Sequence, residues 1–331
     1  MTVYNGAPFL RDAIESILNQ TYAGFKFLIV DNASTDDSRE IIKSYNDPRI
    51  ELVALPENIG QVPALNKGLS LIDTPLVARM DADDISLPNR LEKQVDFMDK
   101  HPDVAISGSF IIVFTGKKET IWKYPLHSDD IKVKLFFECC LPHPALIYRK
   151  TLLDQYNLKY DETLKHSEDW DLFQRTGKYF QLANIPDILF KYRIHNQSVT
   201  RNTFDRQYPA AVRIDDVSLD WLGLKTHPLR NIHRDVAYET LNIKNREPLF
   251  LDNVLQWFDT LKQANFTHNV FSQSSLETFL KERLFIVLTN NTIHGSKAFE
   301  IFKKEKLFRY VPLSWSLKFI IKTVLKKKVP G

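Results

Sequence analysis

The first hundred residues alternate between short apolar runs and stretches in which apolar residues recur at helical spacing. The apolar runs at 26–31, 50–55 and 76–81 predict buried strands. The predicted helices begin near residues 8, 36, 60 and 88, each close to a proline or a capping residue. This alternation predicts an α/β fold in which a mainly parallel sheet carries helices on both faces.

The rest of the chain divides at about residue 203. Before that point strands are predicted at 104–114, 120–125, 144–150 and 188–195, and helices at 130–137 and 166–180. After it, helical spacing predicts helices at 205–223, 248–265, 274–290 and in the tail. We therefore predict an α/β domain over 1–203 and a helical C-terminal region over 204–331.

The first strand is unusually short. Thr2, Val3 and Tyr4 have strand character, and the chain then turns at Asn5 and Gly6. A doubly wound sheet normally begins with a full strand at this position. We therefore expect the first strand to be truncated, with several residues missing upstream.

Three carboxylates, Asp81, Asp83 and Asp84, follow the apolar run at 76–81. On an extended backbone Asp81 and Asp83 project to the same side, where two anions repel unless a cation or N–H donors lie between them. Mg²⁺ and Mn²⁺ prefer oxygen ligands of this kind. The alternative is a solvated turn or a helix cap, for which Asp84 and Ser86 are the best candidates.

A second acid ends the strand at 26–31. Ligands of parallel α/β sheets bind where the strands end at their carboxyl termini. Asp31 and the pair Asp81 and Asp83 all occupy such ends. We expect the three side chains to line one cleft.

Composition is typical of a soluble protein, with 44% apolar and 26% charged residues. No apolar run approaches the roughly 18 residues that a membrane span requires. The adjacent Cys139 and Cys140 cannot build a disulfide framework, and the first residues lack the features of a signal peptide. These features predict a cytoplasmic protein.

The tail is strongly basic. Residues 303–328 hold nine Lys or Arg and one acid, Glu305, although the whole chain has a net charge of only +3. An apolar stripe and a lysine stripe share this segment, formed by Leu317, Ile320, Ile321 and Val324 and by Lys318, Lys322 and Lys326. Trp315 and Phe319 are predicted at a lipid interface. The pattern indicates a basic amphipathic helix on an anionic membrane surface and argues against general nucleic-acid binding, the alternative being a helix packed on the protein.

Seven motifs occur in a familiar order. They are VYNGAPFLRDAIESILNQTY, LIVDNASTDDS, ENIGQVPALNKGL, ARMDADDISLPNRL, HPALIYRK, HSEDWDLFQR and LFKYRIHNQS. Together they resemble the family 2 glycosyltransferases, which are inverting, nucleotide-sugar-dependent enzymes with the GT-A fold. The resemblance covers residues 1 to about 200 and favours the bacterial lipooligosaccharide and capsule subgroup. It implies a GT-A catalytic domain over 1–203 that transfers a hexosyl or N-acetylhexosaminyl group to a surface glycan or lipid-linked glycan.

The resemblance also implies roles for the acidic residues. Asp83 would bind Mn²⁺ or Mg²⁺, and Asp81 would contact the donor ribose or a metal-bound water. Asp169, with Glu168 as second candidate, would be the base that takes the acceptor proton. Because both acids begin a helix, we expect its dipole to keep them ionised.

Further residues are implied on the donor side. Thr2, Val3, Tyr4, Asp31 and Asn32 correspond to the positions that bind the nucleotide. The family more often has a second aspartate where this chain has Asn32, so UDP is expected and dTDP stays open.

Two cations and a histidine complete the set that the resemblance implies. Arg79 would approach ribose or diphosphate or pair with Asp81, and Arg193 would contact phosphate. His195 would be a further metal ligand or a structural residue.

Two other functions fit parts of the pattern. A sugar nucleotidyltransferase also uses a nucleotide cleft and a carboxylate-held metal, but it predicts a Gly-rich phosphate loop where this chain has Asn5-Gly6-Ala7-Pro8. A non-catalytic nucleotide-sugar-binding protein derived from the same fold is the second alternative, because a truncated first strand would weaken the sheet beside the nucleotide.

Overall fold

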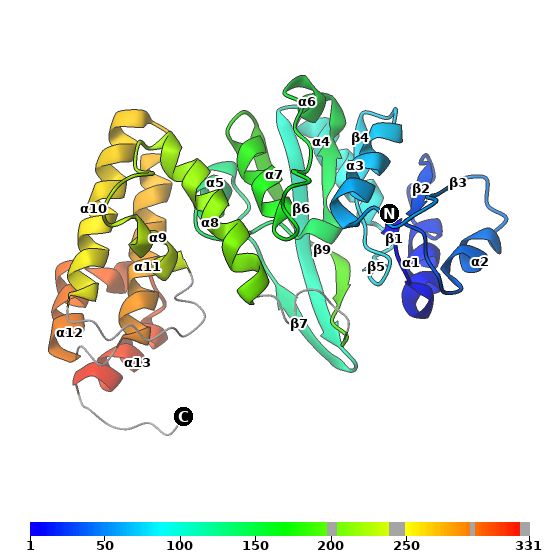
Figure 1. Ribbon diagram of the computed structural model, residues 1–331. Coiled ribbons are helices and arrows are strands. Elements are labelled where there is room, and N and C mark those ends of the chain that lie inside the picture. The colour runs from blue at the N-terminus through cyan, green and yellow to red at the C-terminus, as the bar shows by residue number, and fades with distance from the viewer. Residues whose placement is uncertain (197–203, 238–248, 292–294, 325–331) are drawn as a thin grey trace. The chain divides into compact units, whose positions relative to one another are not determined.

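The computed structural model describes residues 1–196, 204–237, 249–291 and 295–324 (Figure 1). The chain divides into two compact units. Unit 1 contains Met1–Ile131 and Cys139–Ala211, and unit 2 contains Lys132–Glu138 and Val212–Gly331. The domain boundary predicted after residue 203 adjoins the segment 197–203, which lies outside the described residues.

A small parallel sheet opens unit 1. Its strands are β1 (Thr2–Val3), β2 (Phe27–Asp31) and β3 (Ile50–Ala54), in the order β1-β2-β3. The connecting helices are α1 (Ala7–Leu18) and α2 (Ser38–Lys43), and α3 (Gln61–Leu71) follows β3. The apolar stripe of α1 is buried in the same hydrophobic cluster as β2, as its spacing predicts.

The second sheet of unit 1 is mixed. Its strand order is β4-β8-β6-β9-β5, and β7 pairs with β6 outside this path. The strands are β4 (Leu76–Ala78), β5 (Ile85–Ser86), β6 (Val104–Thr115), β7 (Lys118–Trp122), β8 (Ile147–Arg149) and β9 (Gln181–Arg193). Only β6 and β9 run parallel among its named pairs. A parallel sheet was therefore the correct prediction for the first three strands, whereas hairpins and returning strands make the second sheet mixed.

Four short helices support this second sheet. They are α4 (Arg90–Lys100), α5 (Ser128–Leu135), α6 (Lys150–Gln155) and α7 (Glu168–Gly177), with a 3-10 turn at η1 (His143–Ala145). The two sheets are linked by a parallel bridge between Thr2 and Asp81. A cavity of about 560 Å³ extends from this bridge between β2 and β4, lined in part by Leu28, Val77 and Arg79.

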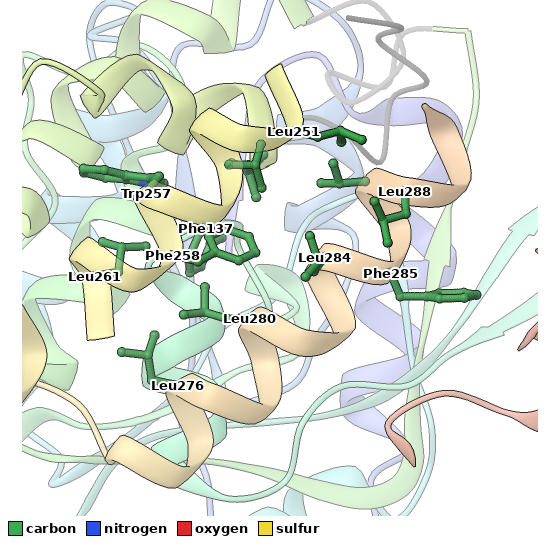
Figure 2. Close-up of a cluster of buried hydrophobic side chains, with 14 of the residues drawn as sticks. Phe137, Leu251, Trp257, Phe258, Leu261, Leu276, Leu280, Leu284, Phe285 and Leu288 are labelled. Carbon is green, nitrogen blue, oxygen red and sulfur yellow. The ribbon is translucent and has the colours of Figure 1, made fainter. Parts of the chain in front are cut away.

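The helical part of the chain is α8 (Phe204–Trp221), α9 (Arg230–Ala237), α10 (Phe250–His268), α11 (Gln273–Asn290), α12 (Gly295–Lys304), η5 (Leu307–Arg309) and α13 (Leu313–Val324). No strand follows Arg193 in the described residues, as predicted. Figure 2 shows Leu276, Leu280 and Leu284 of α11 directed toward α10, with Phe137 beside them. Trp257 is fully buried in this cluster.

Two features of the helical part bear on the prediction for the tail. Within the described residues, no helix combines the length and the hydrophobicity needed to cross a bilayer. Phe319 is only 2% exposed and belongs to the core cluster, so the prediction that it contacts lipid is wrong. Lys326 and the lysines after it lie outside the described residues.

Candidate active site

The acidic loop after β4, residues 79–84, brings three carboxylates together. Asp81, Asp83 and Asp84 each offer an oxygen, and these oxygens lie within 4.8 Å of one another. Asp84 is completely buried, and its Oδ1 accepts a hydrogen bond from the Arg193 backbone N–H at 2.7 Å. Its Oδ2 has no hydrogen-bond partner among the described residues. Burial, followed by the charges of Asp81 and Asp83, raises the pKa of Asp84 well above its ordinary value.

This geometry argues against Asp84 as a solvated turn residue or a helix cap. Helix α4 begins at Arg90, so Asp84 does not cap it. A buried carboxylate that lacks a partner for one oxygen is costly unless a cation or donor approaches it. The three carboxylates therefore suit a hard divalent cation, whose charge would offset the repulsion between them.

Arg79 forms a two-pronged ion pair with Asp81. Its Nη1 and Nη2 lie 2.6 and 2.5 Å from the two carboxylate oxygens. Burial opposes the charge of Arg79, but Asp81 together with Tyr160 and Tyr148 outweighs it, so the pKa of the guanidinium is raised. Burial is also the main reason that the pKa of Asp81 is raised despite this partner. Of the two roles predicted for Arg79, the ion pair with Asp81 is the one present in the structure.

Arg90 is a site-supporting residue that the sequence analysis did not single out. It is fully buried, and its Nη2 donates to the carbonyl oxygens of Arg79 and Leu146 at 2.6 and 3.1 Å. Burial lowers its pKa to about 9. A signal was present, since an arginine at the first position of a helix opposes the dipole and needs another reason to be there.

The end of β9 holds the acidic loop from the other side. The Nε2 atom of His195 lies 2.9 Å from Asp83 Oδ2, and the ring of His195 packs 4.6 Å from that of Phe9. Arg193 donates through Nε to the Asp83 carbonyl at 2.7 Å and through Nη2 to Asp12 at 3.0 Å. The structure thus brings Asp83, His195 and Arg193 together, and it gives Arg193 the task of fixing the loop.

Glu168 and Asp169, the two acids predicted to act as general base, lie at the start of α7. Ser167 precedes the helix in the left-handed region, with φ of 60°, and its side chain does not cap it. Asp169 Oδ1 instead accepts the Trp170 N–H at 2.8 Å. Trp170 is buried and packs in the interior.

The expectation that the helix dipole keeps both acids ionised is wrong for Glu168. Burial, followed by the charge of Asp169, raises the pKa of Glu168 to about 7. Burial also raises the pKa of Asp169. Burial of both carboxylates, with the charge of Asp169 acting on Glu168, outweighs what the helix end offers.

A buried polar chain lies behind Asp169. His143 Nε2 is 2.7 Å from the Tyr160 hydroxyl, which is 2.8 Å from the Tyr148 hydroxyl. His143 Nδ1 lies 3.9 Å from Asp169 Oδ2. Burial, and secondly Arg79, lowers the pKa of His143 well below its ordinary value, so the imidazole is neutral. Sequence spacing gives no indication of these hydrogen bonds, because the three residues come from η1, β8 and a loop.

The donor-side residues surround β1. Val3 is buried, whereas Tyr4 is 51% exposed and free to present its ring. Asp31 is fully buried and accepts from Arg39 Nε at 2.8 Å and from the Ser34 N–H at 3.1 Å.

Asn32 has a different set of partners. Its side-chain nitrogen donates to the loop at 58–60, and its oxygen accepts the Ile59 N–H. Asp31 and Asn32 therefore both fix neighbouring loops through bonds within the protein.

The acidic loop and the start of α7 lie close enough to interact, because Arg79 and Asp81 influence the pKa values of both Glu168 and Asp169. Residues in the left-handed region flank the site at Asn5, Ala33 and Ser167. Strained backbone of this kind concentrates at functional sites.

Comparison with known proteins identifies the family of the chain. Residues 1–199 match the family described as Glycosyl transferase family 2. The chain belongs to this family. The resemblance inferred from the seven motifs is thus confirmed, and the matched residues include every predicted site residue.

Curated relatives agree with family 2 membership. An uncharacterised glycosyltransferase of Haemophilus influenzae is 28% identical over 209 residues, which are 60% of this chain and 65% of that protein. The amylovoran biosynthesis glycosyltransferase AmsE of Erwinia amylovora is 32% identical over 58% of this chain and 73% of its own length. The O-antigen biosynthesis glycosyltransferase WbnJ of Escherichia coli is 34% identical over 61% of this chain and 81% of its own length.

A solved structure extends the comparison to the fold. TarS of S. aureus, residues 1–349, crystallised in complex with UDP-GlcNAc, aligns with a TM-score of 0.60 at 15% identity. The alignment covers 93% of this chain and 87% of that one. The predicted GT-A fold is confirmed at this level.

Proposed function

We propose that this family 2 member transfers a sugar, with inversion, from a nucleoside diphosphate sugar to a glycan acceptor in bacterial surface polysaccharide or lipooligosaccharide synthesis. One observation carries the proposal: the carboxylate cluster of the acidic loop and the acid pair of α7 share an electrostatic environment across Arg79 and Asp81. The first group suits a diphosphate with its cation, and the second suits a base for the acceptor.

Asp83 would hold Mn²⁺ or Mg²⁺, with Asp81, Asp84 and His195 as neighbouring donors. When bound, such an ion neutralises the charge that develops on the departing diphosphate. The side-chain contacts assign the remaining tasks. Arg79 keeps Asp81 in place, and Arg193 fixes the loop backbone at Asp83. The loop is therefore held in position by the protein's own bonds.

Asp169 would accept the proton of the acceptor hydroxyl. As that oxygen forms a bond to the anomeric carbon, the bond from this carbon to the phosphate oxygen breaks on the opposite face, and the nucleoside diphosphate leaves. The raised pKa of Asp169 makes it a stronger base than an exposed aspartate. His143 beside it is neutral and so adds no positive charge that would weaken this base. Glu168, beside it, would position the acceptor.

We assign the nucleotide to the region between β1 and the loop at 58–60. Tyr4 offers an exposed ring that can stack on a base, and the backbone of Thr2 and Val3 borders the same edge. The Asn32 amide is engaged by the loop and the buried Asp31 by Arg39 and Ser34, which leaves the base to be recognised by backbone groups. We propose UDP as the nucleotide.

The acceptor class follows from the relatives. AmsE and WbnJ are named for amylovoran and O-antigen biosynthesis, both polymers of the bacterial cell surface. We propose that this chain acts on a related glycan or lipid-linked glycan in the cytoplasm, at the inner face of the plasma membrane.

The test is nucleoside diphosphate release from a panel of UDP-, dTDP- and GDP-sugars with Mn²⁺ or Mg²⁺. D83A and D169N should each reduce the rate at least about 100-fold, as expected for lost charge stabilisation and a lost general base. D129N is the matched control, since Asp129 is an exposed acid at the start of another helix.

Three outcomes would contradict the proposal. Full activity in D83A and D169N would remove the assigned roles. Pyrophosphate release from a nucleoside triphosphate and a sugar phosphate would indicate a nucleotidyltransferase. Tight nucleotide-sugar binding without turnover on any acceptor would indicate a binding protein.

A further inference from the structure

A group of apolar side chains is exposed near the end of the described chain. We define the terminal surface as Phe308, Tyr310, Leu313, Trp315, Leu317 and Ile321, together with the basic residues Lys306, Arg309, Lys318 and Lys322. Leu313 is 74% exposed, and the other five are between 39% and 53% exposed. Scattered apolar residues on a surface are ordinary, but six within fourteen positions form a patch that indicates a binding surface.

The orientation of α13 is the strongest sign of such a role. Its buried side includes two hydroxyl residues, Ser316 at 2% and Thr323 at 5% exposure, with Phe319 between them. Leu313, Leu317 and Ile321 recur every four residues and lie on the exposed side. A helix that only covers its own domain would place leucines inward and hydroxyls outward. Here the apolar stripe is exposed and can contact a lipid bilayer or another protein.

Basic residues accompany the stripe. Lys318 and Lys322 are exposed and, at the same four-residue spacing, lie next to Leu317 and Ile321. Lys306 and Arg309 precede the helix and are exposed as well. From Lys306 to Val324 the sequence has no Asp or Glu. The terminal surface is therefore apolar and purely cationic.

We infer that the terminal surface binds an anionic lipid bilayer. An apolar stripe with adjacent lysines and an exposed tryptophan is the pattern of a helix that lies in the headgroup region. Each basic residue near an anionic leaflet contributes about 1 kcal/mol. A protein partner would need acidic residues facing four cations, whereas the bilayer supplies both the apolar layer and the negative charge. Because α13 does not span the membrane, attachment is peripheral and reversible.

This surface is independent of the proposed reaction, since none of its residues belongs to the candidate active site. Its experiment therefore needs no donor or acceptor. The intact chain is sedimented with vesicles of phosphatidylglycerol and phosphatidylcholine, and with vesicles of phosphatidylcholine alone. We expect binding to the anionic vesicles that weakens with salt and a much weaker signal with the neutral ones.

Two double variants separate the apolar contribution to vesicle binding from the electrostatic one. L313S/L317S removes apolar side chains that are exposed, so the fold should persist, and vesicle binding should fall at least tenfold. K318E/K322E should reduce binding to anionic vesicles by at least about 30-fold, the equivalent of about 1 kcal/mol for each of two cations. The controls are F266S, at a 78% exposed phenylalanine of α10, and K225E, at an exposed lysine away from the terminal surface.

The inference is overturned by any of three results. The intact chain could fail to bind anionic vesicles, or both double variants could bind as the controls do. Alternatively, light scattering could show a dimer that L313S/L317S converts to a monomer without changing vesicle binding, in which case the terminal surface joins two copies of the chain.

Discussion

His195 Nε2 lies 2.9 Å from Asp83 Oδ2, although 112 positions separate the two residues in the chain. The contact joins the end of β9 to the acidic loop and fixes the orientation of the carboxylate that we assign to the cation. A residue in this position acts on metal affinity, either as a ligand or by orienting one.

For this reason, H195A should raise the Mn²⁺ concentration needed for half-maximal activity by roughly 10–100-fold. The rate at saturating Mn²⁺ should change much less. A Mn²⁺ titration of nucleoside diphosphate release measures both quantities, and calorimetric Mn²⁺ binding measures affinity without turnover. H127A, at an exposed histidine elsewhere in unit 1, serves as control. An unchanged Mn²⁺ requirement in H195A would rule out this role.

Replacing Arg79 by methionine should destabilise unit 1 by about 2–3 kcal/mol. This is below the ~3–5 kcal/mol typical of broken, fully buried pairs, because the Asp81 side chain keeps 28% of its exposure. The loss arises from leaving Asp81 without its partner, so R79M/D81N should recover much of it. Urea unfolding measures the free energies. K26M breaks the pair with Asp73, where both side chains are at least 66% exposed, and should cost about 0–1 kcal/mol.

The rate should depend on pH through the acid pair of α7. A base works only when deprotonated, and burial raises the pKa of both Glu168 and Asp169, that of Glu168 to about 7. We therefore expect kcat/KM to rise with pH over a range above that of an exposed aspartate and then to level off. Glu168 ionises with a pKa of about 7 beside Asp169, and this change of charge should add an inflection near pH 7 that E168Q lacks. A pH profile that is the same in E168Q would contradict the coupling.

The free energy of unfolding should also depend on the ionisation of Glu168, but it should fall as pH rises, whereas kcat/KM rises. In the unfolded chain Glu168 has its ordinary pKa of 4.5, and in the fold the pKa is about 7. The fold thus binds an extra proton between these values, and its stability falls as pH rises through this window. E168Q should remove this fall, which urea unfolding at pH 5 and pH 8 would detect as a larger gain for the variant at pH 8.

Truncation of Leu284 in α11 should destabilise unit 2 by about 2–5 kcal/mol, the usual range for a buried leucine changed to alanine. Leu284 is 2% exposed and contributes to the cluster in Figure 2. F266A on α10 removes a larger side chain that is 78% exposed and should change stability by less than about 0.5 kcal/mol. Thermal unfolding compares the two, and equal effects would show that the cluster is not the core of this unit.

Strand ends made the acidic residues of the site predictable. Asp81 and Asp83 follow an apolar run, and the parallel bridge between Thr2 and Asp81 brings the end of that run beside β1. The contacts of Arg90 and of His143 with Tyr160 were not predictable, because they join residues whose spacing follows no local period. The raised pKa of Glu168 was missed for a related reason: the dipole follows from the helix alone, but burial depends on everything packed around it.

The tail shows a different limit of sequence patterns. Its apolar residues form more than one stripe, and the sequence does not say which stripe packs inward. The pattern predicts that Phe319 contacts lipid, but Phe319 is buried. Leu313 lies outside the predicted apolar stripe, yet it is the most exposed residue of the terminal surface. Only the partners offered by α11 and α12 decide that orientation.

The bonds that Arg79, Arg193 and His195 make to the acidic loop have a thermodynamic consequence. A loop held at Asp81, at the Asp83 carbonyl and at the Asp83 carboxylate has already lost most of its conformational entropy when the chain folds. A divalent ion that arrives there has little backbone left to order. Its binding heat should therefore come from the exchange of water for carboxylate oxygens, with a small change in heat capacity.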